Sequence, residues 1–121
     1  MKVLGIYGSP RKNGNSDVLL DAALDAAAEA GAEVDRVYAR SEKVNGCLEC
    51  GGCDDTGVCV QKDAMADIYP KLLEADAIIL ASPIFFYAVP AQAKAIADRT
   101  QAMWSERKLR KPMSEWSNYE R

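Results

Sequence analysis

Short apolar runs alternate along this chain with longer segments whose apolar residues recur at helical spacing. Residues 3–7 form an apolar run that ends at Gly8, and this pattern indicates a buried strand followed by a loop. Apolar positions three and four apart then continue to Ala30, and Gly31 supplies a helix stop. We expect Ser16 to cap this helix at its N-terminus.

The same alternation returns after an irregular segment rich in cysteine and glycine, residues 46–60. Residues 34–39 before this segment are a weaker strand candidate, and Asp63 after it can cap a second helix. The run 77–82 is apolar on both faces, as in central parallel strands, and Pro90 suits the first helical position of a third helix. The order of these segments predicts an α/β protein with a doubly wound parallel sheet.

Composition limits the classes of protein to which the chain can belong. Its 121 residues, 49% hydrophobic and 27% charged, fit one globular domain. A formal net charge of −3 without a basic face argues against nucleic acid, and no apolar run is long enough to cross a membrane. No secretion signal opens the chain, so we expect a cytoplasmic protein. The absence of histidine excludes His-based catalytic triads and His metal ligands.

The loop between the first strand and the first helix has the composition of an anion site. A helix N-terminus presents free amide groups and the positive end of the helix dipole. The loop adds hydroxyl, amide and basic side chains, namely Ser9, Arg11, Lys12, Asn13, Asn15 and Ser16. It matches neither the dinucleotide nor the nucleoside-triphosphate glycine fingerprint, so an ordinary connecting loop is the alternative. Its position at the carboxyl end of a strand favours a phosphate ligand.

The cysteines of the chain all lie in one short segment, at Cys47, Cys50, Cys53 and Cys59. Four cysteines allow three disulfide pairings, but a reducing compartment argues against disulfides. Zinc usually takes two C-x2-C pairs separated by a dozen or more residues. Four thiols converging from a single loop are more typical of a [4Fe–4S] cluster, with zinc and unmetallated thiols as alternatives. The acidic residues Glu49, Asp54 and Asp55, without Lys or Arg from 47 to 59, favour a low reduction potential.

An aromatic loop follows the apolar run 77–82. Three consecutive aromatic residues, Phe85, Phe86 and Tyr87, cannot all face one core. Either a planar aromatic ligand or a contact between subunits would explain them. Because this loop and the first loop follow parallel strands, both lie at the same edge of the sheet, and this favours the ligand.

Taken together, the two loops and the cysteine spacing resemble the iron–sulfur flavoproteins, a branch of the NADPH-dependent FMN reductase group with a flavodoxin-like fold. The resemblance covers residues 1 to about 104 and rests on residues 3–16, on the four cysteines and on Ser82-Pro83-Ile84-Phe85-Phe86. It implies that the FMN phosphate is held by Ser9, Arg11, Asn13, Asn15 and Ser16. It implies that the ribityl chain and ring of FMN are lined by Pro83, Ile84, Phe85 and Phe86. The ligands of the [4Fe–4S] cluster would be Cys47, Cys50, Cys53 and Cys59.

The resemblance also implies a function and an assembly. Family members pass electrons between a one-electron donor such as ferredoxin, the cluster and a flavin, and they work as dimers or tetramers. We therefore expect a redox flavoprotein that takes electrons from a ferredoxin-type donor or NAD(P)H and passes them to a small acceptor. No side chain is nominated as a catalytic acid or base. The alternatives are a non-catalytic electron carrier or metal-binding subunit without a complete flavin site, and a cluster-free NAD(P)H-dependent FMN or quinone reductase.

The number of strands in the expected sheet indicates where the domain ends and whether copies of the chain associate. A flavodoxin-like sheet has five strands in the order 2-1-3-4-5, whereas this chain supplies three, in the order 2-1-3, with flanking helices. We expect residues 1–104 to form the FMN-binding domain, with a cluster loop at 46–60, and residues 105–121 to form an irregular or helical tail. An uncovered apolar edge at residues 77–82 predicts a homo-oligomer.

Overall fold

Three parallel strands and four helices make up the computed structural model, which describes residues 1–110. The strands are β1 (Lys2–Tyr7), β2 (Glu33–Tyr38) and β3 (Ala77–Ala81). The helices are α1 (Asn15–Glu29), α2 (Met65–Glu74), α3 (Ala91–Arg99) and α4 (Gln101–Arg110). The last part of the expected tail, residues 111–121, lies outside the described residues.

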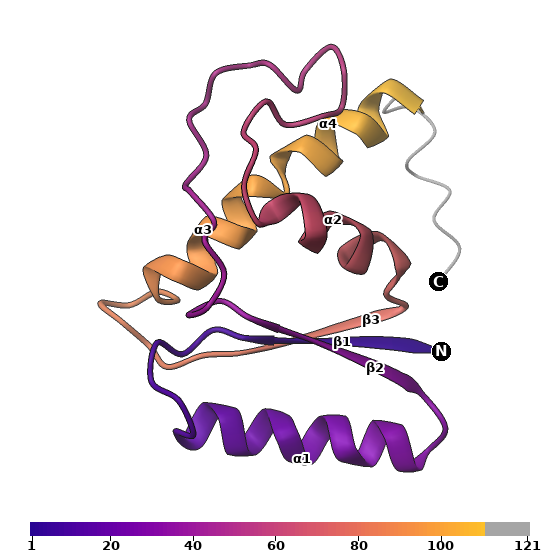
Figure 1. The fold of residues 1–121 in the computed structure, drawn as a ribbon, viewed down its shortest axis with the longest axis vertical. Coiled ribbons are helices and arrows are strands. Elements are labelled where there is room, and N and C mark those ends of the chain that lie inside the picture. The colour runs from indigo at the N-terminus through magenta and orange to yellow at the C-terminus, as the bar shows by residue number, and fades with distance from the viewer. Residues whose placement is uncertain (111–121) are drawn as a thin grey trace.

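The sheet has the order β2-β1-β3, and both pairings of the central strand are parallel. This confirms the expected order 2-1-3 and the flavodoxin-like fold class. Val3 of β1 is in register with Val34 of β2 and with Ala77 of β3. Figure 1 shows α1 on one face of this sheet and α2 and α3 on the other. Because all three strands run in one direction, their carboxyl ends lie at a single edge.

Alternate residues of β1 supply the two hydrophobic cores, one on each face of the sheet. Leu4 and Ile6 point toward α2 and α3, where they pack in a cluster with Met65 and Ile68. The other face of the sheet packs against α1 through Val3, Tyr7, Leu20 and Leu24. The strand is therefore buried on both faces, as the apolar run at residues 3–7 predicts.

The third strand lies at an edge of the sheet and keeps an apolar face open. Ile78 and Leu80 are 49% and 45% exposed, although they are in register with the buried Leu4 and Ile6. On the opposite face, Ala77, Ile79 and Ala81 pack against the α1 core. Among the described residues, no helix covers Ile78 and Leu80 as α2 and α3 cover the neighbouring strand.

Two helix boundaries differ from the expectation. Gly14, not Ser16, is the N-cap of α1, and its carbonyl oxygen accepts a hydrogen bond from Val18 N–H at 3.1 Å. The expected third helix is divided at Thr100 into α3 and α4, and α4 continues to Arg110. Periodicity missed residues 105–110 because α4 is a polar helix that buries little beyond Ala102 and Ser105.

A close approach of two loops makes Gly8 a sensitive position. A Cβ at Gly8 would lie 2.8 Å from the Ser82 Cβ and 3.2 Å from the Ala81 carbonyl oxygen, so Gly8→Ala forces the loops apart. We expect the substitution to lower the free energy of unfolding by about 1–3 kcal/mol in urea denaturation. The matched control is Gly46→Ala, where a Cβ would meet nothing within 4 Å. Equal stability of the two variants would contradict the prediction.

Candidate functional site

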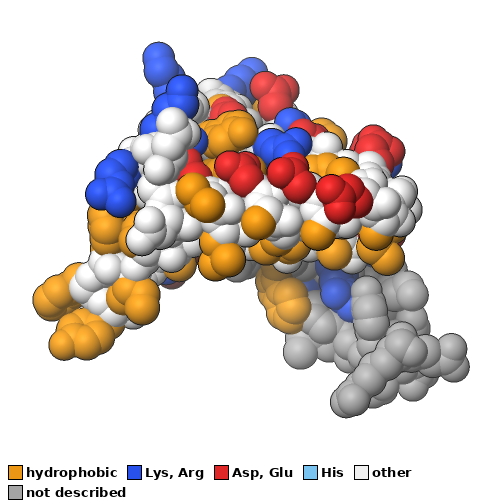
Figure 2. Space-filling view, turned by 90° about the horizontal axis from the view of Figure 1, so that it is seen from below, with side chains coloured by type: hydrophobic (Ala, Val, Ile, Leu, Met, Phe, Trp, Pro, Cys, Tyr) orange, Lys and Arg blue, Asp and Glu red, His pale blue; other side chains and the backbone are white. Residues whose placement is uncertain are grey.

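The loops that follow β1 and β3 meet at the carboxyl edge of the sheet. Gly8 N–H donates a 2.8 Å hydrogen bond to the Ala81 carbonyl oxygen, so the two loops start side by side. The β1–α1 loop leads into the N-terminus of α1, and the β3–α3 loop leads to Pro90 at the start of α3. In Figure 2, basic side chains and projecting hydrophobic side chains gather at the same end of the molecule.

Hydrogen bonds within the protein fix the backbone of the β1–α1 loop, while most of its polar side chains are exposed to solvent. Ser9 is buried and its Oγ accepts a hydrogen bond from Arg11 N–H at 3.2 Å. Asn13 has φ of 56°, and its N–H donates to Asp17 Oδ2 at 3.0 Å. The side chains of Arg11, Asn13 and Asn15 are exposed, whereas Ser16 is half-buried. The predicted phosphate residues therefore surround the N-terminus of α1, where free amides and the helix dipole favour an anion.

Beneath this loop lies a polar cluster that the sequence analysis did not predict. Asp17 is 3% exposed and forms a 3.0 Å ion pair with Arg40, whose guanidinium also lies over the Tyr38 ring. Tyr38 in turn stacks on Tyr7, with ring centroids 4.4 Å apart. Burial, together with the hydrogen bond that Tyr7 donates to Asp21, raises the pKa of Tyr7 to about 12. The only signal in the sequence was Asp17 in the first turn of a helix.

A tight hairpin turn presents the aromatic residues of the β3–α3 loop. Phe85 and Ala88 exchange backbone hydrogen bonds of 2.8 and 3.0 Å, and this leaves Phe86 and Tyr87 as the two residues of the turn. Both have positive φ, 44° and 66°, in a position that usually takes Asn-Gly, so the turn is strained. Their side chains are 96% and 95% exposed, which agrees with the argument that three consecutive aromatic residues cannot share one core. Ile84 is also exposed.

The four cysteines converge on one cavity. They are free thiols, with Cys47 and Cys50 exposed and Cys53 and Cys59 half-buried. All four line a single cavity of about 660 Å³, called the cysteine cavity below. Within residues 1–110, no three His, Cys, Asp or Glu side chains lie close enough together to hold a single metal ion. The structure thus places the four predicted cluster ligands around one cavity.

Helices α3 and α4 form the inner wall of the cysteine cavity. The Cys53 sulfur lies 3.7 Å from Ser105 Oγ, and that hydroxyl donates to Asp54 Oδ1 at 3.1 Å. Gly57 packs so closely that a Cβ there would lie 2.6 Å from the Glu106 side chain. Residues beyond 104 thus contact the cysteine loop directly.

A buried ion pair fixes both ends of the cysteine loop, residues 46–60. The Arg99 guanidinium donates to both carboxylate oxygens of Asp63, at 2.6 and 3.1 Å, and to the Asn45 carbonyl oxygen at 3.0 Å. These bonds from Arg99, and then those from the backbone, lower the pKa of Asp63 although burial acts in the opposite direction. Asp63 Oδ1 also accepts a hydrogen bond from Met65 N–H at 3.1 Å, but the N-cap of α2 is Ala64 and not the expected Asp63.

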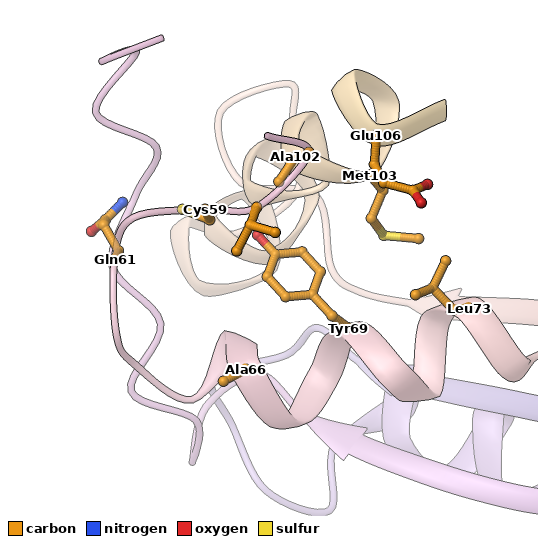
Figure 3. Close-up of a pocket in the computed structure, with 10 residues that line it drawn as sticks. Cys59, Gln61, Ala66, Tyr69, Leu73, Ala102, Met103 and Glu106 are labelled. Carbon is orange, nitrogen blue, oxygen red and sulfur yellow. The ribbon is translucent and has the colours of Figure 1, made fainter. Parts of the chain in front are cut away.

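An apolar cavity of about 360 Å³ lies beside the cysteine cavity, between α2 and α4. Figure 3 shows Tyr69, Leu73 and Met103 pointing into it, with Cys59 at its edge. Cys59 lines both cavities, so its sulfur marks the boundary between an acidic and an apolar environment.

The two candidate sites do not meet within one chain. The residues lining the cysteine cavity include none from the β1–α1 loop or the β3–α3 loop. In Figure 1 the cysteine loop lies on the side of the sheet that carries α2 and α4, whereas the β1–α1 loop leads to α1 on the opposite side. None of the helices in the described part of the chain is long and apolar enough to cross a membrane.

Known structures resemble this chain in fold. A flavone reductase matches 83% of this chain and 30% of its own chain with a TM-score of 0.64 at 29% identity. RosB with bound 8-demethyl-8-formylriboflavin-5'-phosphate matches 84% of this chain and 42% of its own with a TM-score of 0.65. At 18% identity, the second likeness concerns the fold alone.

Curated relatives and a family description match by sequence. Proteins named iron–sulfur flavoprotein are 48% identical over 82% of the chain in Archaeoglobus fulgidus and 46% identical over 83% in Methanosarcina thermophila. The matches take up 45% and 52% of those proteins, so the chain spans about half the length of these relatives. The family described as NADPH-dependent FMN reductase matches residues 1–116. Together with the sheet order and the loops at its carboxyl edge, this shows that the chain belongs to the NADPH-dependent FMN reductase family.

Proposed function

We propose that this chain is a redox flavoprotein that binds FMN and a [4Fe–4S] cluster and passes electrons to a small acceptor. The observation that carries the proposal is the convergence of four free cysteines on one cavity, in a member of an FMN reductase family. When bound, the cluster supplies one-electron chemistry and FMN supplies two-electron chemistry, so the protein's part is to hold and tune them.

The carboxyl edge of the sheet supports the FMN site. Flavodoxin-like sheets bind FMN where the connections after β1 and β3 diverge, and here Gly8, directly after β1, donates a hydrogen bond to Ala81, the last residue of β3. Exposed donors surround the N-terminus of α1, and the Arg11 side chain lies close enough to Gly14 to contact an anion there. Pro83, Ile84, Phe85 and Phe86 would line the remainder of FMN, because an apolar aromatic loop suits a planar ring.

The cysteine cavity supports a cluster better than it supports zinc. Structural zinc usually takes two C-x2-C pairs that lie a dozen or more residues apart, whereas here all four cysteines come from one loop of thirteen residues and line one cavity. The names of the relatives support the same group.

Electrons would enter from a ferredoxin-type donor or NAD(P)H. Cys47 and Cys50, the exposed pair, lie on the solvent side of the cysteine cavity, where a protein donor could approach. Two alternatives remain distinct: a non-catalytic electron carrier that holds only the cluster, and a cluster-free NAD(P)H-dependent reductase. Iron, sulfide, zinc and flavin content per chain of anaerobically purified protein distinguishes them. The proposal requires both FMN and iron with sulfide, and the lack of either would overturn it.

We also propose that copies of this chain associate into a homo-oligomer. Ile78 and Leu80 form the open apolar face of β3, and the loop that follows this strand carries the exposed Phe86 and Tyr87. Exposed apolar groups of this size favour association. Since the cysteine cavity and the sheet edge are separate in one chain, a second copy could bring its cysteine loop to the FMN edge.

Arg11→Ala and Ser16→Ala are expected to weaken FMN binding. Each variant removes a donor beside the α1 N-terminus, and loss of a charge-assisted hydrogen bond from Arg11 raises the Kd of FMN about tenfold or more. Titration of apoprotein with FMN, followed by flavin fluorescence, measures the effect. Lys71→Ala, a surface lysine paired with Asp35, is the control with unchanged affinity. An unchanged Kd in both test variants would refute the phosphate site.

Alanine at any one of Cys47, Cys50, Cys53 or Cys59 is expected to remove most iron and sulfide. Each variant loses one of the four thiolates that the cluster requires, while the β1–α1 and β3–α3 loops stay intact. FMN affinity should therefore remain close to that of the unsubstituted protein. Chemical iron and sulfide assays beside flavin titration measure both quantities. Full iron and sulfide in all four variants would exclude this loop as the cluster site.

Leu80→Lys is expected to shift the protein toward a monomer. A charge on the open face of β3 opposes burial of that face against a second copy. Sedimentation at micromolar concentration should give at least twice 13.2 kDa for the unsubstituted protein and a lower mass for the variant. The matched control is Leu19→Lys, which changes an exposed leucine on α1. A 13.2 kDa unsubstituted protein that does not aggregate would contradict the proposed assembly.

A further inference from the structure

Arg99 is the most deeply buried charged side chain beside the cysteine loop. It is 1% exposed, and its two terminal nitrogens are occupied by Asp63 and by the Asn45 carbonyl oxygen. Arginine is almost never buried to this extent without a specific partner for its charge. Asp63 supplies such a partner on one side of the guanidinium.

The third nitrogen of this guanidinium has no partner. Arg99 Nε is the only side-chain nitrogen or oxygen in the described part of the chain that is buried without a hydrogen bond. A buried donor without an acceptor is costly, and such atoms in folded proteins call for a specific explanation. An acceptor that becomes available only in the loaded protein would supply one.

Cys59 is the neighbour that could provide the acceptor. The Cys59 sulfur lies near the Arg99 guanidinium and interacts with it, as the Asp63 carboxylate does. Tyr69 lies against the same two residues, because its hydroxyl donates to the Arg99 carbonyl oxygen at 2.8 Å. Tyr69 and Cys59 also line the same apolar cavity. Three side chains from the cysteine loop, α2 and α3 therefore meet at one point.

We infer that Arg99 is a positioning residue that donates its free Nε–H to the Cys59 sulfur when Cys59 is a cluster ligand, and that its charge raises the reduction potential of the cluster. This inference rests on the proposed function. Reduction adds negative charge, so a buried cation and a hydrogen bond to a ligand sulfur stabilise the reduced state more than the oxidised state. The interaction is strong because the guanidinium is shielded from water.

Arg99 thus shifts the reduction potential of the cluster in the opposite direction to the acidic residues of the cysteine loop. Glu49, Asp54 and Asp55 are exposed, so solvent weakens their effect on the potential. The Arg99 guanidinium is buried, and the Asp63 carboxylate, which is buried with it, offsets part of its charge. Removal of Arg99 therefore leaves the negative charge of Asp63 near the cluster, whereas removal of Asp63 leaves the positive charge of Arg99.

This difference in sign provides the test. Arg99→Gln and Asp63→Asn both break the same ion pair and should both lower the free energy of unfolding. Their effects on the cluster should differ: Arg99→Gln lowers the midpoint potential, whereas Asp63→Asn, which keeps the cation and its Nε–H, raises it. Redox titration of the anaerobic, cluster-loaded protein, followed by electron paramagnetic resonance, measures the potential. Arg99→Lys keeps a charge without the Nε–H and should lie between Arg99→Gln and the unsubstituted protein.

A second measurement uses cluster retention. The loss of a charge-assisted hydrogen bond to a ligand should make iron release to a chelator about tenfold faster in Arg99→Gln than in Asp63→Asn. If Arg99→Gln does not retain a cluster, the midpoint potentials of Arg99→Lys and Asp63→Asn test the inference instead. Arg99→Lys is expected below the potential of the unsubstituted protein and Asp63→Asn above it. Shifts in the same direction, or no shift, in a loaded protein would overturn this inference and leave the proposed function intact. Absence of iron and sulfide from the unsubstituted protein would overturn both.

Discussion

The pairing of β1 with a parallel strand on each side is the constraint on which the candidate FMN site depends. Since β1 is central, its register with β3 brings Gly8 within hydrogen-bond distance of Ala81 and fixes the two loops at one edge. The close packing at Gly8 leaves no room for a side chain between them. Burial of β1 on both faces makes this register hard to change, because a shift by one residue would exchange the two cores.

The second half of the described chain depends on a different interaction, the ion pair between Asp63 and Arg99. The cysteine loop has little regular structure and little apolar burial of its own. Its two ends are joined instead through the Arg99 guanidinium, which contacts Asn45 before the loop and Asp63 after it. Four cysteines can face one cavity because this pair and the contact of Ser105 with Cys53 hold the loop on α3 and α4.

Much of the fold was predictable from local patterns. The apolar runs at 3–7 and 77–82 gave strands at Lys2–Tyr7 and Ala77–Ala81 because buried parallel strands need continuous apolar residues. Helix ends were less accurate, since Gly14 rather than Ser16 caps α1. Asp17 lies in the first turn of α1 and is buried in an ion pair with Arg40. No local signal distinguishes a solvent-exposed aspartate from one that a distant arginine will bury.

The sequence by itself determined two of the strands, the chemical character of the two loops and the spacing of the cysteines, because each depends on residues near one another in the chain. Only the tertiary structure decided which charges act on those groups. The loop from Cys47 to Cys59 contains acidic residues and no basic ones, which favours a low potential, yet Arg99, far along the chain, lies beside Cys59 with an unpaired Nε. Electrostatic interactions act through space and strengthen where water is excluded, so the environment of a site depends on which distant residues the fold buries beside it.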